Sequence, residues 1–214
     1  MNRSSPALLL TFLAAVLAVG ASAQLVAPNL RTVTMRDGLS SDHVQSMAVD
    51  GRGYLWIGTS DGLNRFDGRR VKVYRYEGRP DALPGDKITA LAWDGARYLL
   101  IGTNAPYLTL LDPLADTLHR VPLPIPAFSA HGEQRVTDLL VDGLGRIWVA
   151  HGARCLSLFD VRTRSFTTVE IPPPAPTARS REVISGMLED AQGILWLATF
   201  RGLVRFDPAT RTAR

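Results

Sequence analysis

The sequence predicts an all-β chain, folded as a β-propeller of four four-stranded blades. One observation is a repeat: four related stretches each contain an aspartate, and these aspartates lie 44, 48 and 48 residues apart, at Asp50, Asp94, Asp142 and Asp190. The other is that each copy consists of short alternating or β-branched and aromatic runs between glycine-bearing turns, without helical periodicity. Repeats of about 40 to 50 residues built from such strands are typical of propeller blades.

The first copy shows why one repeat is one blade. Its first two apolar runs flank 50–53, where Gly51 and Gly53 permit the positive φ that a tight hairpin needs. Gly62 ends the second run, and the third run alternates apolar and polar residues, as a half-buried strand does. The fourth run carries basic side chains that discourage edge-to-edge pairing. The four expected strands are 44–50, 54–59, 63–67 and 70–76.

The same pattern divides the rest of the chain. Proline- and glycine-rich connectors separate the copies at 78–86, 122–134 and 172–181. In a propeller these connectors lie on one face and the Asp-x-x-Gly hairpins on the other. Because the connectors are long and varied loops, we expect their face to bind the ligand. The predicted blades are 44–78, 88–123, 136–171 and 183–214.

The N-terminus predicts export. Arg3, an apolar run at 7–19 and the small residues Ala21 and Ala23 are typical of a signal peptide, so we expect residues 1–23 to be removed and the rest to be periplasmic. The segment 24–43 then connects to the first blade and contains one expected strand, Leu30–Met35.

Composition narrows the function classes. The chain has a net charge of +4, and its arginines are scattered among turns and outer strands, so a nucleic-acid partner is not expected. The single cysteine, Cys155, cannot form an internal disulfide and is expected to be a small buried apolar residue.

The repeated residues predict structure rather than chemistry. Trp56, Trp148 and Trp196 occupy equivalent positions, and a residue needed once per blade is expected to pack one blade on the next. The aspartates of the same turns are expected to accept hydrogen bonds from backbone N–H groups of the turn. A calcium site is the alternative, but it needs six or more oxygen ligands, and each turn supplies one carboxylate. The histidines show no zinc-ligand spacing, so we expect no metal and no cofactor.

Polar residues that differ between blades are the candidates for ligand binding. They lie where the second strand of each copy ends, near the mouth of the expected channel. His151 replaces the threonine of the other copies, and a hydrogen-bonded structural histidine is the competing interpretation; ordinary surface drift would explain the others. The candidates are Ser60, Asp61, Asn104, His151, Arg154 and Arg201.

These motifs resemble a known family. The string Asp-x-x-Gly-x-(Leu/Ile)-Trp begins at Asp50, Asp142 and Asp190, and Gly-Leu-(Asn/Val)-Arg-Phe-Asp follows at Gly62 and Gly202. Together they resemble the two-component regulator propeller repeat, and the preceding residues 36–44 resemble the approach to its first blade. The second copy departs from the pattern, with Leu100 in place of the tryptophan.

The resemblance implies a seven-bladed ring, which would need on the order of 330 residues at this repeat length. A partial ring is therefore one expectation. The strand count leaves another, a closed four-bladed ring in which Leu30–Met35 completes the last blade.

The resemblance also implies the function. It is that of the ligand-sensing, non-catalytic propeller of a bacterial receptor, which binds a small molecule or oligosaccharide. The implied partners are further blades, a membrane helix, and a histidine kinase or diguanylate cyclase output domain. The alternatives are a propeller enzyme of the lyase or quinoprotein type, a protein-interaction scaffold, and a truncated receptor remnant.

Overall fold

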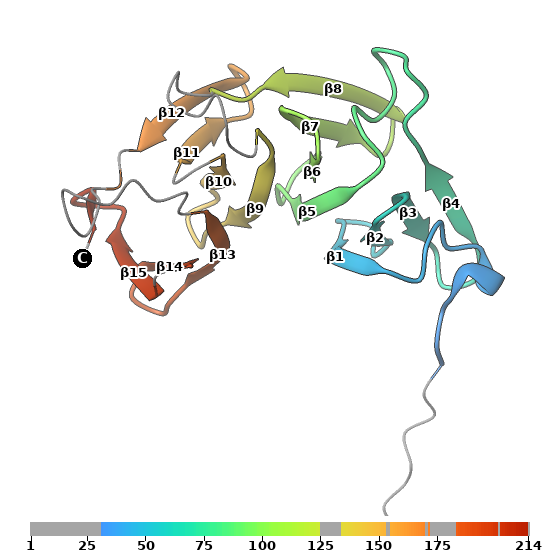
Figure 1. Cartoon of the computed structure of the whole chain (residues 1–214), viewed down its shortest axis with the longest axis horizontal. Coiled ribbons are helices and arrows are strands. Elements are labelled where there is room, and N and C mark those ends of the chain that lie inside the picture. The colour runs from blue at the N-terminus through green and yellow to red at the C-terminus, as the bar shows by residue number, and fades with distance from the viewer. Residues whose placement is uncertain are drawn as a thin grey trace, which may run out of the picture. The chain divides into compact units, whose positions relative to one another are not determined.

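The computed structural model describes residues 31–124, 134–152, 155–169, 171, 183–200 and 202–213. All of its strands belong to one compact unit, Val33–Arg214. They form four four-stranded antiparallel sheets, and in each sheet the strands follow one another in chain order (Figure 1). The predicted fold class is confirmed.

Each sheet is one copy of the sequence repeat, and the sheets are called blades 1 to 4 below. Blade 1 comprises β1 (Val44–Val49), β2 (Leu55–Thr59), β3 (Gly62–Phe66) and β4 (Val71–Tyr74). Blade 2 comprises β5 (Ile88–Trp93), β6 (Leu99–Thr103), β7 (Tyr107–Asp112) and β8 (Thr117–Pro122). Blade 3 comprises β9 (Val136–Val141), β10 (Ile147–His151), β11 (Cys155–Asp160) and β12 (Ser165–Val169). Blade 4 comprises β13 (Ile184–Glu189), β14 (Leu195–Thr199), β15 (Gly202–Asp207) and β16 (Thr212–Ala213).

Successive blades pack through their sheet faces. The first strands contact in the order β1, β5, β9 and β13, and Figure 1 shows the four sheets following one another along an arc. We call the side of a blade that packs on the next blade its forward face, and the opposite side its backward face. Three apolar clusters among the described residues fill the junctions between blades 1 and 2, 2 and 3, and 3 and 4.

The junction between blades 1 and 2 shows how the alternation of a strand produces these two faces. Trp56 and Leu63 project from the forward face of blade 1, and both are fully buried. They pack against Leu91, Leu99 and Ile101 on the backward face of blade 2. Since side chains alternate across a strand, each sheet buries one set of residues forward and the other set backward.

Hydrogen bonds between the first strands add to this packing. Ser46 Oγ accepts from the backbone N–H of Leu91 at 2.9 Å, and at the equivalent place in blade 3 Asp138 Oδ2 accepts from the N–H of Met187 at 2.6 Å. Between blades 2 and 3, Thr89 Oγ1 donates to a backbone carbonyl of β9 at 2.7 Å. Polar as well as apolar contacts therefore hold neighbouring blades together.

The glycines in the second strands of blades 1 and 2 have a packing reason. A Cβ atom added to Gly58 would lie 2.5 Å from Ile88 Cγ2, and one added to Gly102 would lie 2.8 Å from Val136 Cβ. Both distances are shorter than any ordinary van der Waals contact, so the close approach of neighbouring blades requires glycine at these positions.

The segment before blade 1 differs from its prediction. Residues 31–34 form no strand, and a short 3-10 helix, η2 (Met35–Asp37), follows them and ends at Gly38 with φ +107°. The outer strand of blade 4 is β16, from its own repeat. The prediction that Leu30–Met35 completes the last blade is therefore wrong, because the fourth copy supplies all four of its strands.

Some predictions fall outside this description. The expected signal peptide, 1–23, and Leu30 lie outside the described residues. Within the ranges that the structure describes, no helix has the length and apolar character needed to cross a membrane.

Candidate functional site

The repeated aspartate and tryptophan form one structural unit in three blades. In blade 1, Asp50 Oδ1 accepts the backbone N–H groups of Arg52 and Tyr54, and Asp50 Oδ2 accepts the indole N–H of Trp56 at 2.8 Å. The same indole bond, also 2.8 Å long, joins Trp148 to Asp142 and Trp196 to Asp190. The predicted role of the aspartates is confirmed, and Trp56 and Trp148 pack in blade junctions as predicted.

Burial and these hydrogen bonds oppose each other at Asp142. Burial would raise the pKa of this carboxyl, but hydrogen bonds from Trp148 and Arg146 stabilise the charged form, and the pKa lies below its usual value. Blade 2 lacks this unit: Leu100 fills the tryptophan position, and Asp94 accepts only turn amides.

Four of the six predicted ligand-binding residues are described, and three of them are partly or fully exposed at the connector end of their blades. Ser60 Oγ shares a hydrogen bond of 3.0 Å with Ser41 Oγ, and Asp61 forms an ion pair with Arg75. Asn104 is exposed. In the described part of the chain, no hydrogen bond or ion pair joins residues of this set from different blades. Arg154 and Arg201 lie outside the described residues.

His151 is a core residue. Its ring is only 1% exposed, and Nε2 lies 2.8 Å from Ser157 Oγ. Nδ1 is buried with no hydrogen-bond partner among the described residues, and burial lowers the pKa of the imidazole to about 4. The histidine is therefore neutral at pH 7, and its burial favours the structural interpretation over direct ligand contact.

Cys155 is also buried, as expected, and burial raises the pKa of its thiol. A raised thiol pKa keeps the sulfur protonated and unreactive at neutral pH.

A buried polar network at the connector end of blade 1 was not predicted. Ser40 donates its backbone N–H to Asn64 Oδ1 at 2.8 Å, and its hydroxyl lies 2.9 Å from Asn64 Nδ2 and 2.8 Å from Thr59 Oγ1. In blade 2 Thr109 takes the place of Asn64, and its buried hydroxyl has no partner in the region described. The serine position is filled there by Pro84, which has no polar side chain. The available signal in the sequence was that blade 1 has Leu-Ser at 39–40, whereas blade 2 has Leu-Pro at the equivalent positions 83–84.

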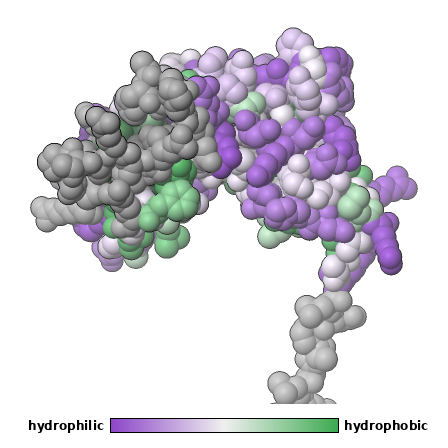
Figure 2. All heavy atoms as spheres, viewed as in Figure 1, coloured by the Kyte–Doolittle hydropathy of each residue, from purple (hydrophilic) through white to green (hydrophobic). Residues whose placement is uncertain are grey.

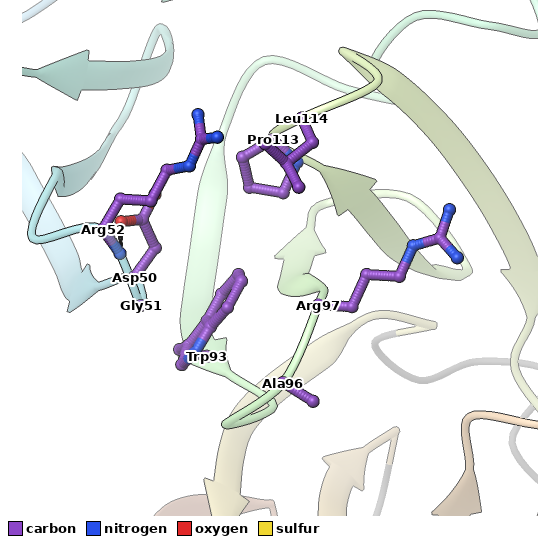
Figure 3. A pocket seen from close by; sticks show the side chains of 8 residues that line it. All are labelled: Asp50, Gly51, Arg52, Trp93, Ala96, Arg97, Pro113 and Leu114. Carbon is purple, nitrogen blue, oxygen red and sulfur yellow. Dashed lines mark hydrogen bonds between the residues drawn. The ribbon is translucent and has the colours of Figure 1, made fainter.

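A pocket lies at the opposite end, where the hairpins of blades 1 and 2 meet (Figure 3). Its volume is about 200 Å³. The lining residues come from the β1–β2 turn, the end of β5, the β5–β6 turn and the β7–β8 turn. They are Asp50, Gly51, Arg52, Trp93, Ala96, Arg97, Pro113 and Leu114.

Trp93 was missed as a candidate because it stands outside the repeated tryptophan position. It occurs where the other blades have Val49, Val141 and Glu189. That departure from the repeat was the available signal.

The two end blades each leave one apolar face uncovered. On the forward face of blade 4, Leu188 is 66% and Leu203 is 61% exposed, and on the backward face of blade 1, Met47 is 62% and Val49 is 57% exposed. Figure 2 shows hydrophobic side chains gathered over β13 to β15. The equivalents of these residues in the blade junctions are packed against a neighbouring blade.

Metal binding has no candidate in the ranges described, where no group of three or more histidine, cysteine, aspartate or glutamate side chains is placed to hold an ion.

Comparison with known sequences identifies the repeat. Residues 38–61 and 179–201 match the model of the two component regulator propeller family. Histidine kinase P4 of Formosa agariphila is 49% identical over 45 residues, which are 21% of this chain and 3% of the kinase. The matched residues lie in the copies of blades 1 and 4, which carry the motifs on which the resemblance was based.

Comparison with solved structures supports the fold. The extracellular domain of the putative hybrid two component system BT4673 from B. thetaiotaomicron aligns with a TM-score of 0.65 and 22% identity, over 80% of this chain and 22% of that one. The corresponding domain of BT3049 from the same organism aligns with a TM-score of 0.60 and 21% identity, over 86% and 31%.

A catalytic protein has the same architecture. Virginiamycin B lyase from Staphylococcus aureus aligns with a TM-score of 0.58 and 13% identity, over 78% of this chain and 53% of the lyase. The chain thus spans less than a third of the two extracellular domains and about half of the lyase. At these identities the likeness concerns the fold alone.

Proposed function

We propose that this chain forms part of the extracytoplasmic propeller of a bacterial signal-transduction receptor, in which it contributes to ligand recognition without catalysis. The observation that carries the proposal is the match of two blades to the two component regulator propeller model, within a chain that aligns with the extracellular domains of two hybrid two component systems.

The use of the titratable side chains supports a non-catalytic role. The turn aspartates are held by backbone amides and an indole, and the buried histidine is neutral and hydrogen-bonded to Ser157. These groups are thus engaged in folding the blades. A general acid or base instead needs access to its substrate.

The uncovered faces of the end blades support a larger assembly. Leu188, Trp196 and Leu203 of blade 4 occupy the positions that Ala48, Trp56 and Leu63 occupy in blade 1, where they face blade 2. We therefore expect further blades of the same repeat as partners, followed by a membrane helix and a kinase or cyclase output domain. Ligand binding to such a ring would shift the population of receptor conformations, with no reaction at the site.

Export is the step that can be tested with this chain. Expression of residues 1–214 with a C-terminal tag in a Gram-negative host should place the protein in the periplasmic fraction, with a mature N-terminus at Gln24 by mass spectrometry. A matched variant with Leu9→Arg and Leu10→Arg should stay unprocessed in the cytoplasm, because charges in the apolar run abolish signal-peptide function. Cytoplasmic retention of the unmodified chain, with residues 1–23 intact, would contradict the proposed location.

Receptor function itself is tested by reading the DNA sequence downstream of this chain. In-frame blades, an apolar segment of about 20 residues and a kinase or cyclase domain downstream of codon 214 would support it. A reading frame that joins these blades to a soluble hydrolase or lyase domain would contradict it.

A further inference from the structure

The pocket between blades 1 and 2 has a floor and walls suited to a flat ring. Trp93 is half-buried, and its indole lies against the backbone of Gly51, so that a Cβ atom there would be 3.5 Å from Trp93 Cζ2. Pro113 and the exposed Leu114 face it from the β7–β8 turn (Figure 3). Aromatic and prolyl surfaces of this kind bind apolar rings by stacking and burial.

Two arginines line the same space, and their side chains run in different directions: that of Arg52 extends toward Pro113, whereas that of Arg97 points away from Trp93 and Pro113 (Figure 3). Arg52 is exposed, and its guanidinium has no hydrogen bond or ion pair with any residue that the structure describes. Arg97 donates from Nε and Nη2 to Asp112 Oδ2 at 2.8 and 2.7 Å, and its guanidinium lies over the Tyr98 ring, with Cζ 5.1 Å from the ring centroid. The N–H donors beside Trp93 and Pro113 that have no partner in the described part of the chain are therefore those of Arg52.

The carboxylate of Asp50 also lines the pocket, and its charge bears on any ligand. Both of its oxygens already accept hydrogen bonds, three in all, from Arg52 N, Tyr54 N and Trp56 Nε1. These neutral donors occupy the oxygens of Asp50 without removing its negative charge, and Asp112 pairs with Arg97. Arg52 is thus the cation at the rim that has no carboxylate partner among the described residues.

The equivalent position in blade 4 is arranged differently. Glu189 replaces Trp93 there, and its Oε2 accepts the backbone N–H of Gly143 at 2.6 Å. A side chain of the protein itself thus satisfies the turn amide and places a negative charge where blade 2 has an indole. The indole of Trp93 with the neighbouring guanidinium of Arg52 therefore belongs to the junction of blades 1 and 2.

We infer that this pocket binds small aromatic carboxylates, with the ring between Trp93 and Pro113 and the carboxylate paired with the guanidinium of Arg52. A cavity of about 200 Å³ accommodates one six-membered ring with a small substituent, since cavities of about 150 Å³ hold benzene. Planar bidentate pairing with a guanidinium orients the acid group. This site lies at the hairpin end of the blades, away from the residues selected at the connector end.

Benzoate is the probe, and indole N–H resonances are the readout. The chain has four tryptophans, and Trp93→Phe identifies the resonance of Trp93 in a ¹H–¹⁵N spectrum of the purified chain. We expect benzoate to shift this resonance saturably, with a Kd of about 1 mM for a ligand of this size. Benzyl alcohol, which has the ring without the charge, and acetate, which has the charge without the ring, should each bind at least fivefold more weakly.

Substitution of one arginine separates this site from general charge effects. Arg52→Gln should weaken benzoate binding at least fivefold, whereas Arg162→Gln, the same change on an exposed turn of blade 3, should leave it unchanged. Both positions are exposed, so both variants should fold with the indole spectrum of the parent.

Three results would overturn the inference. They are the absence of a saturable Trp93 shift, equal binding of benzoate to the parent and to Arg52→Gln, and equal binding of benzyl alcohol and benzoate. None of these depends on export or on a receptor role, so the site and the proposed function fail independently.

Discussion

The indole Nε1 of Trp148 lies 2.8 Å from Oδ2 of Asp142, six residues earlier in the chain, and this bond joins the second strand of blade 3 to the turn that precedes it. Trp56 with Asp50 and Trp196 with Asp190 repeat it at the same length. The indoles of Trp56 and Trp148 also pack in a blade junction, so in blades 1 and 3 one residue pair fixes both the hairpin turn and the surface presented to the next blade.

Trp148→Phe should lower the free energy of unfolding by about 2 kcal/mol, because the variant loses a buried hydrogen bond to a charged acceptor and part of a buried ring. Urea unfolding measures this change. Trp93→Phe is the matched control, since Trp93 is half-buried and its indole nitrogen has no hydrogen-bond partner in the described part of the chain; it should change stability by less than about 1 kcal/mol. Equal losses in the two variants would show that the bond to Asp142 contributes nothing.

His151 predicts a dependence of stability on pH. Burial holds its folded-state pKa at about 4, below the ordinary value of 6.5, so the unfolded chain binds the proton more readily. This contribution is fully present above pH 6.5 and is lost as the pH falls toward 4, with a total of about 3 kcal/mol.

The variant His151→Gln isolates this effect, because it removes the titrating group and leaves the carboxylates unchanged. The difference in the free energy of unfolding between parent and variant should vary between pH 7 and pH 4.5 and be constant above pH 7. Asp138 has a raised pKa because of burial, and its contribution cancels in this difference. A difference that does not change with pH would contradict the assignment of His151 as a buried neutral imidazole.

The close approach of the blades predicts that alanine destabilises the chain at one glycine and is tolerated at another. Gly102→Ala should destabilise the chain by about 1 to 3 kcal/mol, since its Cβ would lie 2.8 Å from Val136 Cβ and one blade would have to shift. Gly186→Ala, in the first strand of blade 4, places its Cβ 3.8 Å from Ala198 Cβ and should be neutral within about 0.5 kcal/mol. Thermal or urea unfolding decides, and a tolerated Gly102→Ala would mean that blades 2 and 3 pack less closely than the structure shows.

The blades were predictable from sequence because strand alternation and turn glycines are local features that recur four times. Trp56 was assigned to packing for the same reason, and the structure adds its hydrogen bond to Asp50. The hydrogen bonds between the first strands of neighbouring blades were not predictable. Ser46 and Asp138 are different residue types at one structural position, and their partners lie 45 and 49 residues further along the chain.

The expected strand at Leu30–Met35 failed for a physical reason. Its alternating residues satisfy a local strand pattern, but Thr34 caps a short helix through its bond to the N–H of Arg36, and Asp42 accepts the N–H of Met35 at 2.7 Å. These side-chain bonds take the place of a β-ladder. The pocket was missed because it depends on Trp93 at the end of β5 and Leu114 in the β7–β8 turn, whose proximity follows only from the folded arrangement.

The uncovered forward face of blade 4 predicts association of the isolated chain. Leu188 and Leu203 are more than half exposed on this face, and exposed apolar sheet faces associate in water. Leu188→Lys combined with Leu203→Lys should reduce concentration-dependent association, measured by light scattering, while the thermal midpoint stays within a few degrees of the parent. Leu144→Lys adds a similar charge at a turn residue that is 78% exposed and serves as the control, with association unchanged. If the double variant associates as strongly as the parent, the forward face of blade 4 is not the surface through which the blades meet, and the argument that further blades cover it loses its physical basis.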